Sequence, residues 1–285
     1  MPDTLTREKP IDKPKTTLRE EAETARLLLC APTAYALKYS INPWMKLENA
    51  PDLERAAQQW NELRRTLTED IGATVELVPQ AENCPDMVFT ANAALVRGRT
   101  ALLSNFKHPE RQVEAPHYRK WFEANGYHVV TLPENCKFEG EGDALFAGET
   151  LLAGYGRRSD FSAHVLIAEM LSISVLSLKL VDDRWYHLDT CLFPLGPDAV
   201  VFYPGAFDPA SVEAIRDKFQ TIEISEAEAL RFACNSVIIG NRVVVPSGCP
   251  QLTAELEARN YTVHAVEISE FLKAGGAAKC LTLFV

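Results

Sequence analysis

Apolar and polar positions along the chain follow a pattern that recurs five times. Each repeat contains a short apolar strand, a second apolar strand, an amphipathic helix and a third strand of alternating character. The third strands are predicted at 73–79, 128–133, 174–180, 220–225 and 261–269. The second strands are predicted at 27–32, 100–106, 150–156, 199–205 and 242–248, and the helices at 51–70, 109–125, 160–171, 209–218 and 249–259. Several helices open on a capping residue or a proline, as at Asp52, Asp160 and Asp208-Pro209.

The first strand of the repeat is present in repeats two to five, as MVFTANAALV, DALFAG, TCLFPLG and SVIIG, and is missing from repeat one. The chain ends in LTLFV (281–285), which is expected to supply the missing strand and to close the repeats into a ring. Ring closure removes exposed sheet edges. Chains rich in βαβ units also look self-similar by chance, but here a polar slot recurs together with the strands.

That polar slot lies at the start of the first strand of each repeat. It is occupied in turn by Asn92, Glu139 to Asp143, His187 and Asp189, Asn235, and Cys280. Repeats packed around an axis would bring these residues to one central cavity. A thiol, an imidazole and carboxylates that meet there are typical of a site for covalent catalysis.

His187 and Asp189 are two residues apart, and on an extended segment both side chains would face the same way. A carboxylate beside an imidazole orients the ring and raises its basicity. From the residues alone, a structural role for this pair is as well supported as a catalytic one. The sequence contains no H-x-x-x-H or H-E-x-x-H pair, so it predicts neither a metal site nor a cofactor.

The chain has 7 cysteines, an odd number, and no C-x-x-C motif. This pattern favours a reducing cytoplasm over a disulfide framework or a zinc site. Most of the thiols are expected to fill the core, and Cys191 is interpreted in this way because it lies one residue off the polar slot. Cys280 differs, because it follows the run GGAAK (275–279), whose small side chains let a ligand approach the backbone.

Composition predicts one catalytic domain over residues 23–285, preceded by a polar tail over residues 1–22. With 285 residues, of which 47% are hydrophobic, the chain can bury a large core. A net charge of −10 argues against nucleic acid or an anionic membrane as partner and mildly favours a cationic small molecule. No apolar run reaches membrane-spanning length, and the polar start is unlike a secretory signal. The sequence leaves homo-oligomerisation open.

Four motifs in order, FTAN (89–92), FEGEGD (138–143), HLDTC (187–191) and GGAAKC (275–280), resemble the guanidine-modifying, or pentein, superfamily. The resemblance runs from about residue 27 to the C-terminus. The segments INPWM (41–45), PDMVFTANA (85–93), YGRRS (155–159) and FLKAGGAAKCLTL (271–283) are closer still to one branch, the arginine dihydrolases. The resemblance implies an α/β fold, a five-bladed pseudo-symmetric α/β propeller, which agrees with the repeat.

The resemblance also implies covalent hydrolysis of a guanidinium group. Cys280 would attack the central carbon as a thiolate and form an S-alkylthiouronium adduct. His187 would act first as an acid toward the departing amine and then as a base toward water. Glu139 completes the expected catalytic residues, and Glu139 and Asp189 would hold the guanidinium by charge-assisted hydrogen bonds.

The far end of the substrate requires recognition of an anion. By resemblance, Arg111 and Arg158 would bind the substrate carboxylate, because two guanidinium forks suit that anion. Spacing does not distinguish Arg158 from Arg157, and the serine that follows favours Arg158. Asn42 and Asp143 complete the predicted substrate-binding residues.

Asn92 separates the alternatives within the superfamily. Deiminases and dimethylarginine hydrolases carry an aspartate at the matching place, which suits a cationic guanidinium but repels the oxygen of a neutral ureido group. An asparagine both donates and accepts, so it would keep a citrulline-like product bound for a second attack that yields ornithine, ammonia and carbon dioxide. Glu141 departs from the branch, in which this position is usually small.

The competing functions differ in their end product. A deiminase or a dimethylarginine hydrolase would stop at citrulline, and an amidinotransferase would pass the amidino group to an amine. In another class, the chain would be a propeller that binds a ligand without catalysis, but the joint presence of Cys280, His187, Glu139 and Asp189 argues against this. The sequence leaves open the end product and the preference for free or methylated arginine.

Overall fold

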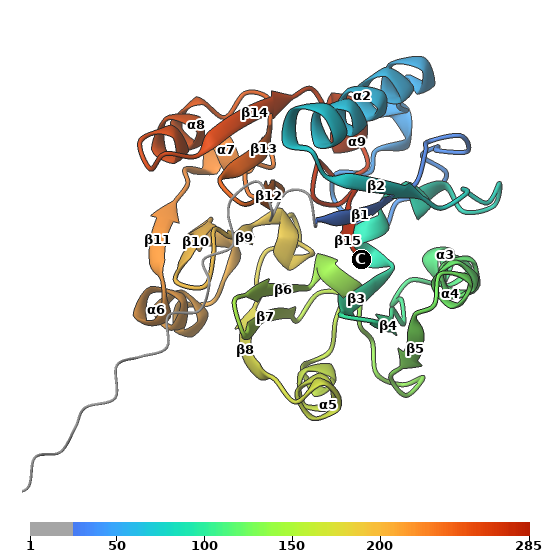
Figure 1. Ribbon diagram of the computed structural model, residues 1–285, viewed down its shortest axis with the longest axis horizontal. Helices are drawn as coiled ribbons and strands as arrows, with labels where there is room; N and C mark the ends of the chain where they lie inside the picture. Colours follow the sequence, from blue (N-terminus) through green and yellow to red (C-terminus); the bar gives the residue numbers. More distant parts are fainter. Residues whose placement is uncertain (1–24) are drawn as a thin grey trace, which may run out of the picture.

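The computed structural model describes residues 25–285, in which five three-stranded sheets stand around a central axis (Figure 1). The inner strands of the sheets are β3 (Ala94–Arg97), β6 (Ala144–Ala147), β9 (Leu192–Pro194), β12 (Val237–Ile239) and β15 (Leu283–Phe284). The middle strands are β1 (Arg26–Leu29), β4 (Thr100–Leu103), β7 (Thr150–Tyr155), β10 (Ala199–Phe202) and β13 (Arg242–Pro246). The outer strands are β2 (Thr74–Leu77), β5 (His128–Thr131), β8 (Ser174–Lys179), β11 (Gln220–Glu223) and β14 (Thr262–Val266). This arrangement confirms the predicted five-bladed α/β propeller, the pentein fold.

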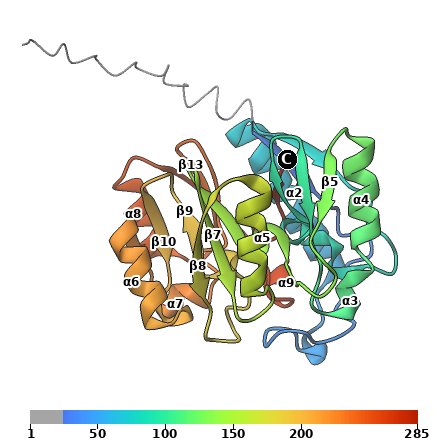
Figure 2. The ribbon, with the colours of Figure 1, turned by 90° about the horizontal axis from the view of Figure 1, so that it is seen from below.

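Each middle strand pairs antiparallel with its inner strand and parallel with its outer strand. Parallel neighbours need a crossover, and helices on the outside of the ring supply it (Figures 1 and 2). These helices are α2 (Leu53–Arg65), α3 (Pro109–Gln112) with α4 (Ala115–Ala124), α5 (Phe161–Leu171), α6 (Pro209–Lys218) and α8 (Pro250–Glu257). The shorter helices α7 (Glu226–Ala229) and α9 (Ser269–Leu272) and the 3₁₀ turns η1 (Leu47–Asn49) and η7 (Pro204–Ala206) lie in connections.

The C-terminal strand closes the ring, as the sequence predicts. β15 pairs antiparallel with β1, so that Phe284 lies opposite Leu27 and Leu283 lies opposite Leu28. The first blade is therefore assembled from both ends of the described chain. Leu27, Leu28 and Leu29 are fully buried, which explains why this middle strand reads as a continuous apolar run rather than as an alternating one.

The helices differ from the prediction in three details. The segment predicted as one helix from 109 to 125 is divided into α3 and α4, because Pro116 has no N–H group and favours the first turn of a new helix. α2 continues into a π-helical turn, η2 (Thr66–Ile71). Asp52 and Asp208 cap their helices, but Asp160 does not, because its Oδ2 accepts from the backbone N–H of Lys137 at 2.8 Å.

Within residues 25–285, no helix is long and apolar enough to cross a membrane. The polar tail predicted for residues 1–22 lies outside the described residues.

Candidate active site

Short helical turns hold polar side chains at the start of the inner strands. The 3₁₀ turns η4 (Thr90–Asn92), η5 (Gly140–Gly142) and η6 (Leu188–Thr190) directly precede β3, β6 and β9. These turns and the residues beside them carry Asn92, Glu139, His187 and Asp189, and the turn before β15 carries Cys280; each of the five is at most 2% exposed. The structure thus brings the residues of the predicted polar slot together at the axis.

Two glycines of the segment FEGEGD allow these turns to pack closely. Gly140 has a φ of +60°, and a Cβ atom there would lie 2.8 Å from the carbonyl oxygens of Ala91 and Ala94. A Cβ atom on Gly142 would lie 2.1 Å from Nδ2 of Asn92. Only glycine permits this approach of η5 to η4, and the approach sets the distance between Asn92 and the neighbouring histidine.

The cysteine side of the site is organised by one asparagine. Cys280 Sγ lies 3.3 Å from Asp189 Oδ2 and 3.1 Å from Asn235 Nδ2. Asn235 Oδ1 accepts from the backbone N–H of Cys280 at 3.0 Å and from that of Ala277 at 3.1 Å. Both ends of the Asn235 amide therefore fix the thiol. The sequence placed Asn235 in the slot, but its spacing did not indicate this role.

Hydrogen bonds around the histidine fix the orientations of the His187 and Asn92 side chains. His187 Nε2 lies 2.7 Å from Glu139 Oε2, and His187 Nδ1 lies 3.5 Å from Asn92 Nδ2. Arg111 Nη1 donates to Asn92 Oδ1 at 2.6 Å. A guanidinium group only donates, so the asparagine oxygen must face Arg111 and its NH₂ must face His187. This network assigns the proton to Nε2 of His187 and leaves Nδ1 unprotonated, so that Nδ1 can act as a base.

Burial is the main influence on how these groups titrate. Burial lowers the pKa of His187 to about 4, although the Glu139 carboxylate acts in the opposite direction. Burial raises the pKa of Asp189 to about 7, opposed by the Lys279 ammonium. Burial, reinforced by the Asp189 carboxylate, raises the pKa of the Cys280 thiol well above its usual range. The ligand-free site therefore holds a neutral thiol and a neutral imidazole at pH 7, and a bound cation would favour the thiolate.

The predicted pairing of His187 with Asp189 is wrong. The two residues do not lie on an extended segment, because residues 188–190 form the turn η6. That turn directs Asp189 toward Cys280, and His187 pairs with Glu139 from the neighbouring blade instead. Glu139, predicted to hold the ligand's guanidinium, is already engaged by His187 and by Arg158 Nη1 at 3.1 Å.

A narrow cavity ends at the cysteine, and we call it the cysteine cavity. Its lining consists of Ile41, Asn42, Met45, Asp86, Phe89, Asn92, Arg111, Arg158, Tyr186, Ala274 and Cys280. Its volume is about 10 Å³, enough for roughly one water-sized group. A larger ligand therefore requires lining side chains to move.

Both predicted arginines reach the cysteine cavity and are 4% exposed. Arg111 forms a two-pronged pair with Glu114, with N···O distances of 2.8 and 2.9 Å. Arg158 lies over the ring of Tyr186, with its Cζ 4.7 Å from the ring centroid. Arg157, which spacing did not distinguish from Arg158, pairs with Asp183 and keeps 28% of its side chain exposed.

Two predicted substrate-binding residues have their polar atoms occupied by the protein. Asn42 lines the cavity, but its Oδ1 accepts from two backbone N–H groups of its own loop and its Nδ2 donates to the carbonyl of Ala274 at 3.1 Å. Asp143 is not among the cavity-lining residues, because it accepts from Ser159 Oγ at 2.6 Å and from the backbone N–H of Leu188 at 3.1 Å. In this arrangement both residues hold loops in place.

Asp86 also lines the cavity, although it was not among the predicted site residues. It is 2% exposed, and its Oδ1 has no hydrogen-bond partner within residues 25–285. Asp189 Oδ1 is likewise buried without a partner in that part of the chain. Two buried acceptors, one beside Cys280 and one in the cavity lining, favour a ligand with two positively charged groups. In the sequence, Asp86 lies three residues before the segment FTAN (89–92), and only this proximity to a predicted site motif points to it.

Metal binding finds no support in the described residues. Between residues 25 and 285, no group of three or more His, Cys, Asp or Glu side chains is arranged to hold a metal ion.

The chain has known relatives whose sequences match it over most of its length. Residues 34–285 match the family described as eukaryotic N,N-dimethylarginine dimethylhydrolase. The chain belongs to this family. This family is part of the guanidine-modifying, or pentein, superfamily, to which the chain therefore also belongs. A dimethylarginine dimethylaminohydrolase of Mycobacterium tuberculosis is 39% identical to the chain, over 93% of the chain and 87% of its own length.

Greater identity is found to part of a longer protein. The bifunctional arginine dihydrolase/ornithine cyclodeaminase ArgZ of Synechocystis sp. is 45% identical over 93% of the chain, which spans only 38% of the length of ArgZ. A crystal structure of the N-terminal domain of ArgZ, an arginine dihydrolase bound to product, matches with a TM-score of 0.88 and 45% identity over 92% of the chain and 97% of that domain. A variant of that domain has been solved with a covalently bound reaction intermediate.

Proposed function

We propose that the protein is an arginine dihydrolase, which converts L-arginine and two water molecules into ornithine, two ammonia and carbon dioxide. One observation carries the proposal: the Cys280 thiol lies beside Asp189, in a site where His187 presents Nδ1 toward an asparagine rather than toward a carboxylate. The identity to the N-terminal domain of ArgZ supports the same activity. Cys280, His187 and Glu139 are the proposed catalytic residues, and the steps below derive their roles.

Substrate binding would activate the thiol. The unpartnered Asp189 Oδ1 accepts from the guanidinium, whose charge compensates the buried carboxylate. The same cation stabilises a thiolate at Cys280, so the thiol proton passes to Nδ1 of His187. Glu139, on the other ring nitrogen at 2.7 Å, stabilises the imidazolium that forms.

The first half of the reaction produces citrulline. The Cys280 thiolate attacks the guanidinium carbon, and the imidazolium of His187 protonates one terminal nitrogen, which leaves as ammonia. The product of this step is an S-alkylthiouronium on Cys280. Neutral His187 then takes a proton from water as the water attacks the same carbon, and the C–S bond breaks. Citrulline is released from the sulfur, and the thiol recovers its proton.

The second half would repeat the attack on a neutral ureido carbon. Asn92 presents an NH₂ group at the reacting end of the site, and this donor can hold the ureido oxygen that an aspartate would repel. Cys280 displaces the second ammonia and forms a thiocarbamate. Water assisted by His187 cleaves this adduct to the carbamate of ornithine, which decomposes to ornithine and carbon dioxide.

The amino-acid end of the substrate matches the charges that line the rest of the cysteine cavity. Arg111 and Arg158 would bind the α-carboxylate, and the free Oδ1 of Asp86 would accept from the α-ammonium. Both arginines now donate to residues of the site, Arg111 to Asn92 and Arg158 to Glu139. We infer that the substrate takes over some of these bonds as the cavity widens.

A product assay tests the proposed function. The protein is incubated separately with L-arginine, L-citrulline and asymmetric dimethylarginine, and the products are identified by mass spectrometry. Ornithine with two ammonia per arginine is the expected result. Citrulline as the end product would identify a deiminase, and faster turnover of the methylated substrate would favour the activity of the M. tuberculosis relative. No turnover of any substrate would contradict the proposal.

Replacing the asparagine of the site by a carboxylate is expected to change the product. In Asn92→Asp, ornithine formation from citrulline should fall by roughly a hundredfold, because the new carboxylate repels the ureido oxygen instead of donating to it. Citrulline formation from arginine should be reduced far less. The ratio of ornithine to citrulline, measured over time, checks this. An unchanged ratio would remove Asn92 from the account of the second step.

Arginine binding is expected to depend on pH through Asp189. Its pKa of about 7 lies above the ordinary 3.8 of an aspartate. The folded protein therefore loses stability as the pH rises toward 7 and Asp189 ionises. A bound cation offsets this loss because it stabilises the carboxylate. In the inactive variant Cys280→Ser, the affinity for arginine should fall by up to about tenfold per pH unit below pH 7 and level off above it. Calorimetry from pH 5 to 8 measures this. The same titration on Asp189→Asn in that background should give weak binding with a flat profile; an equally steep profile would assign the proton to another group.

We also infer that residues 23–285 act as one catalytic domain in a reducing cytoplasm. The seven cysteines are all buried and free, which supports a reducing compartment. Homo-oligomerisation stays a prediction that sedimentation would test.

A further inference from the structure

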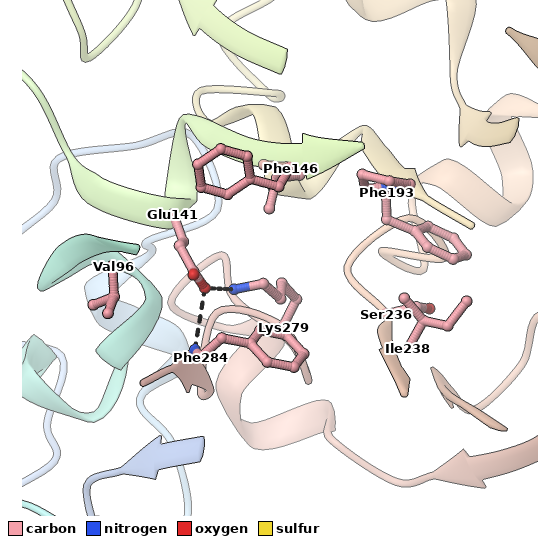
Figure 3. Close-up of a pocket in the computed structure, with 10 residues that line it drawn as sticks. Val96, Glu141, Phe146, Phe193, Ser236, Ile238, Lys279 and Phe284 are labelled. Carbon is pink, nitrogen blue, oxygen red and sulfur yellow. Dashed lines mark hydrogen bonds and ion pairs between the residues drawn. The ribbon is translucent and has the colours of Figure 1, made fainter. Parts of the chain in front are cut away.

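A second cavity lies among the inner strands, and we call it the rear cavity (Figure 3). Its volume is about 280 Å³, near the lower end of the roughly 300–1,000 Å³ of small-molecule sites. Its lining consists of Val96, Glu141, Leu145, Phe146, Phe193, Pro194, Ser236, Ile238, Lys279 and Phe284. None of these residues lines the cysteine cavity. The rear cavity is therefore separate from the site described above.

The walls of the rear cavity come from all five blades. The inner strands β3, β6, β9, β12 and β15 contribute, in that order, Val96, Phe146, Pro194, Ile238 and Phe284. These five side chains are partly exposed, although each is apolar. A ring of apolar side chains around a hollow of this size can surround the hydrocarbon part of a ligand.

The floor of the rear cavity is an ion pair that the proposed reaction does not use. Glu141 Oε2 and Lys279 Nζ are 2.8 Å apart, and the two residues are 6% and 4% exposed (Figure 3). The backbone N–H of Phe284 also donates to Glu141 Oε2, at 3.3 Å. Glu141 thus points away from the cysteine cavity and does not change its charge by direct contact.

The ion pair leaves one donor and one acceptor free. Of its three N–H groups, Lys279 directs one to Glu141 and one to the carbonyl of Thr282 at 3.1 Å, and within residues 25–285 the third has no hydrogen-bond acceptor. Glu141 Oε1 likewise receives no hydrogen bond within the same residues. The floor therefore offers a cationic donor and an anionic acceptor side by side, with apolar walls above them.

The paired charges of Glu141 and Lys279 determine which class of ligand fits the rear cavity. A carboxylate alone would satisfy Lys279 but would bring a second anion beside Glu141, and an amine alone would do the reverse beside Lys279. A zwitterion places its carboxylate on Lys279 and its ammonium on Glu141, and adds no net charge to a poorly solvated floor. We propose that the rear cavity binds an α-amino acid with an apolar side chain, with the side chain among the rings of Phe146, Phe193 and Phe284.

A ligand in the rear cavity would lie next to two chain segments that carry residues of the candidate active site. Lys279 directly precedes Cys280, and Glu141 is two residues after Glu139. Burial raises the pKa of Asp189, and the Lys279 ammonium lowers it. A ligand that binds to the Glu141–Lys279 pair would therefore contact two side chains that are close in sequence to Cys280 and to Glu139, the partner of His187.

Three probes with the same hydrocarbon body test the charge requirement. L-leucine, 4-methylpentanoate and 3-methylbutylamine are titrated into the full-length protein by calorimetry, with and without saturating L-arginine in the Cys280→Ser variant. Leucine is expected to bind at least about tenfold more tightly than the anion or the amine, with an affinity that arginine does not reduce. L-phenylalanine serves as a second zwitterion with a larger side chain.

Matched variants locate the binding. Ile238→Trp fills the rear cavity from its wall and should abolish leucine binding without changing arginine binding, whereas Val165→Trp, on the exposed face of α5, should change neither. The double variant Glu141→Gln/Lys279→Met removes both charges without leaving one unpaired and should remove the preference for the zwitterion. Failure of both amino acids to bind, equal affinity of all three leucine-shaped probes, or unchanged binding in Ile238→Trp would overturn the proposal. Leucine binding that arginine displaces would place the amino acid in the cysteine cavity and would also overturn it, whether or not the protein turns over arginine.

Discussion

Replacing Cys280 by serine is expected to lower the turnover of L-arginine by roughly ten-thousandfold or more, because a serine hydroxyl in this buried site cannot supply a comparable nucleophile. Asp189 and the two arginines are unchanged in this variant, so arginine should still bind. The loss should therefore appear in kcat rather than in the dissociation constant. Ornithine and citrulline formation, followed by mass spectrometry beside calorimetric binding, measures both quantities.

The control for this variant is a second buried cysteine. Cys249 is 3% exposed and occupies the N-cap position of α8, where serine is a favoured residue. Cys249→Ser should keep turnover within about twofold of the original protein, because Cys249 does not line the cysteine cavity and serine is favoured at an N-cap. A covalent adduct trapped on Cys280 during turnover would support its role. Retention of more than a few per cent of the activity in Cys280→Ser would contradict the covalent mechanism.

Replacing His187 by glutamine is the change with the next largest expected effect. The variant can still donate to Glu139, but it can neither accept the thiol proton nor return it to the leaving ammonia, so kcat should fall by roughly a thousandfold. His264→Gln, a substitution on β14 outside the site, is the matched control and should leave turnover unchanged. Measured kcat and KM for arginine in both variants check the expectation.

Glutamine at position 139 separates the role of the carboxylate from that of the imidazole. The Glu139 carboxylate raises the pKa of His187 against the effect of burial, so its loss should move that pKa further below 4. Glu139→Gln is therefore expected to reduce kcat by roughly tenfold to a hundredfold and to shift the acidic limb of the pH profile downward. An unchanged profile would mean that Glu139 only holds Arg158, to which it is also bonded at 3.1 Å.

The order of strands and helices and the closure of the ring followed from the sequence alone. Alternation and apolar runs report local burial, and burial along a strand or helix depends on neighbours that are close in the chain. The five middle strands lie where the pattern predicts them, and LTLFV supplies the missing strand of the first blade. The polar slot recurs at one place in every repeat, so any symmetric packing of the repeats brings Asn92, His187 and Cys280 together.

Only the tertiary structure decided which side chains face one another within that site. His187 pairs with Glu139, 48 residues away, and not with Asp189, two residues away, because the turn η6 sends successive side chains to different sides. Glu141 leaves the site for Lys279, 138 residues away. Such contacts join different blades, and their direction is set by turn geometry and by competition for donors and acceptors. Neither of these is encoded in the local periodicity from which the elements could be predicted.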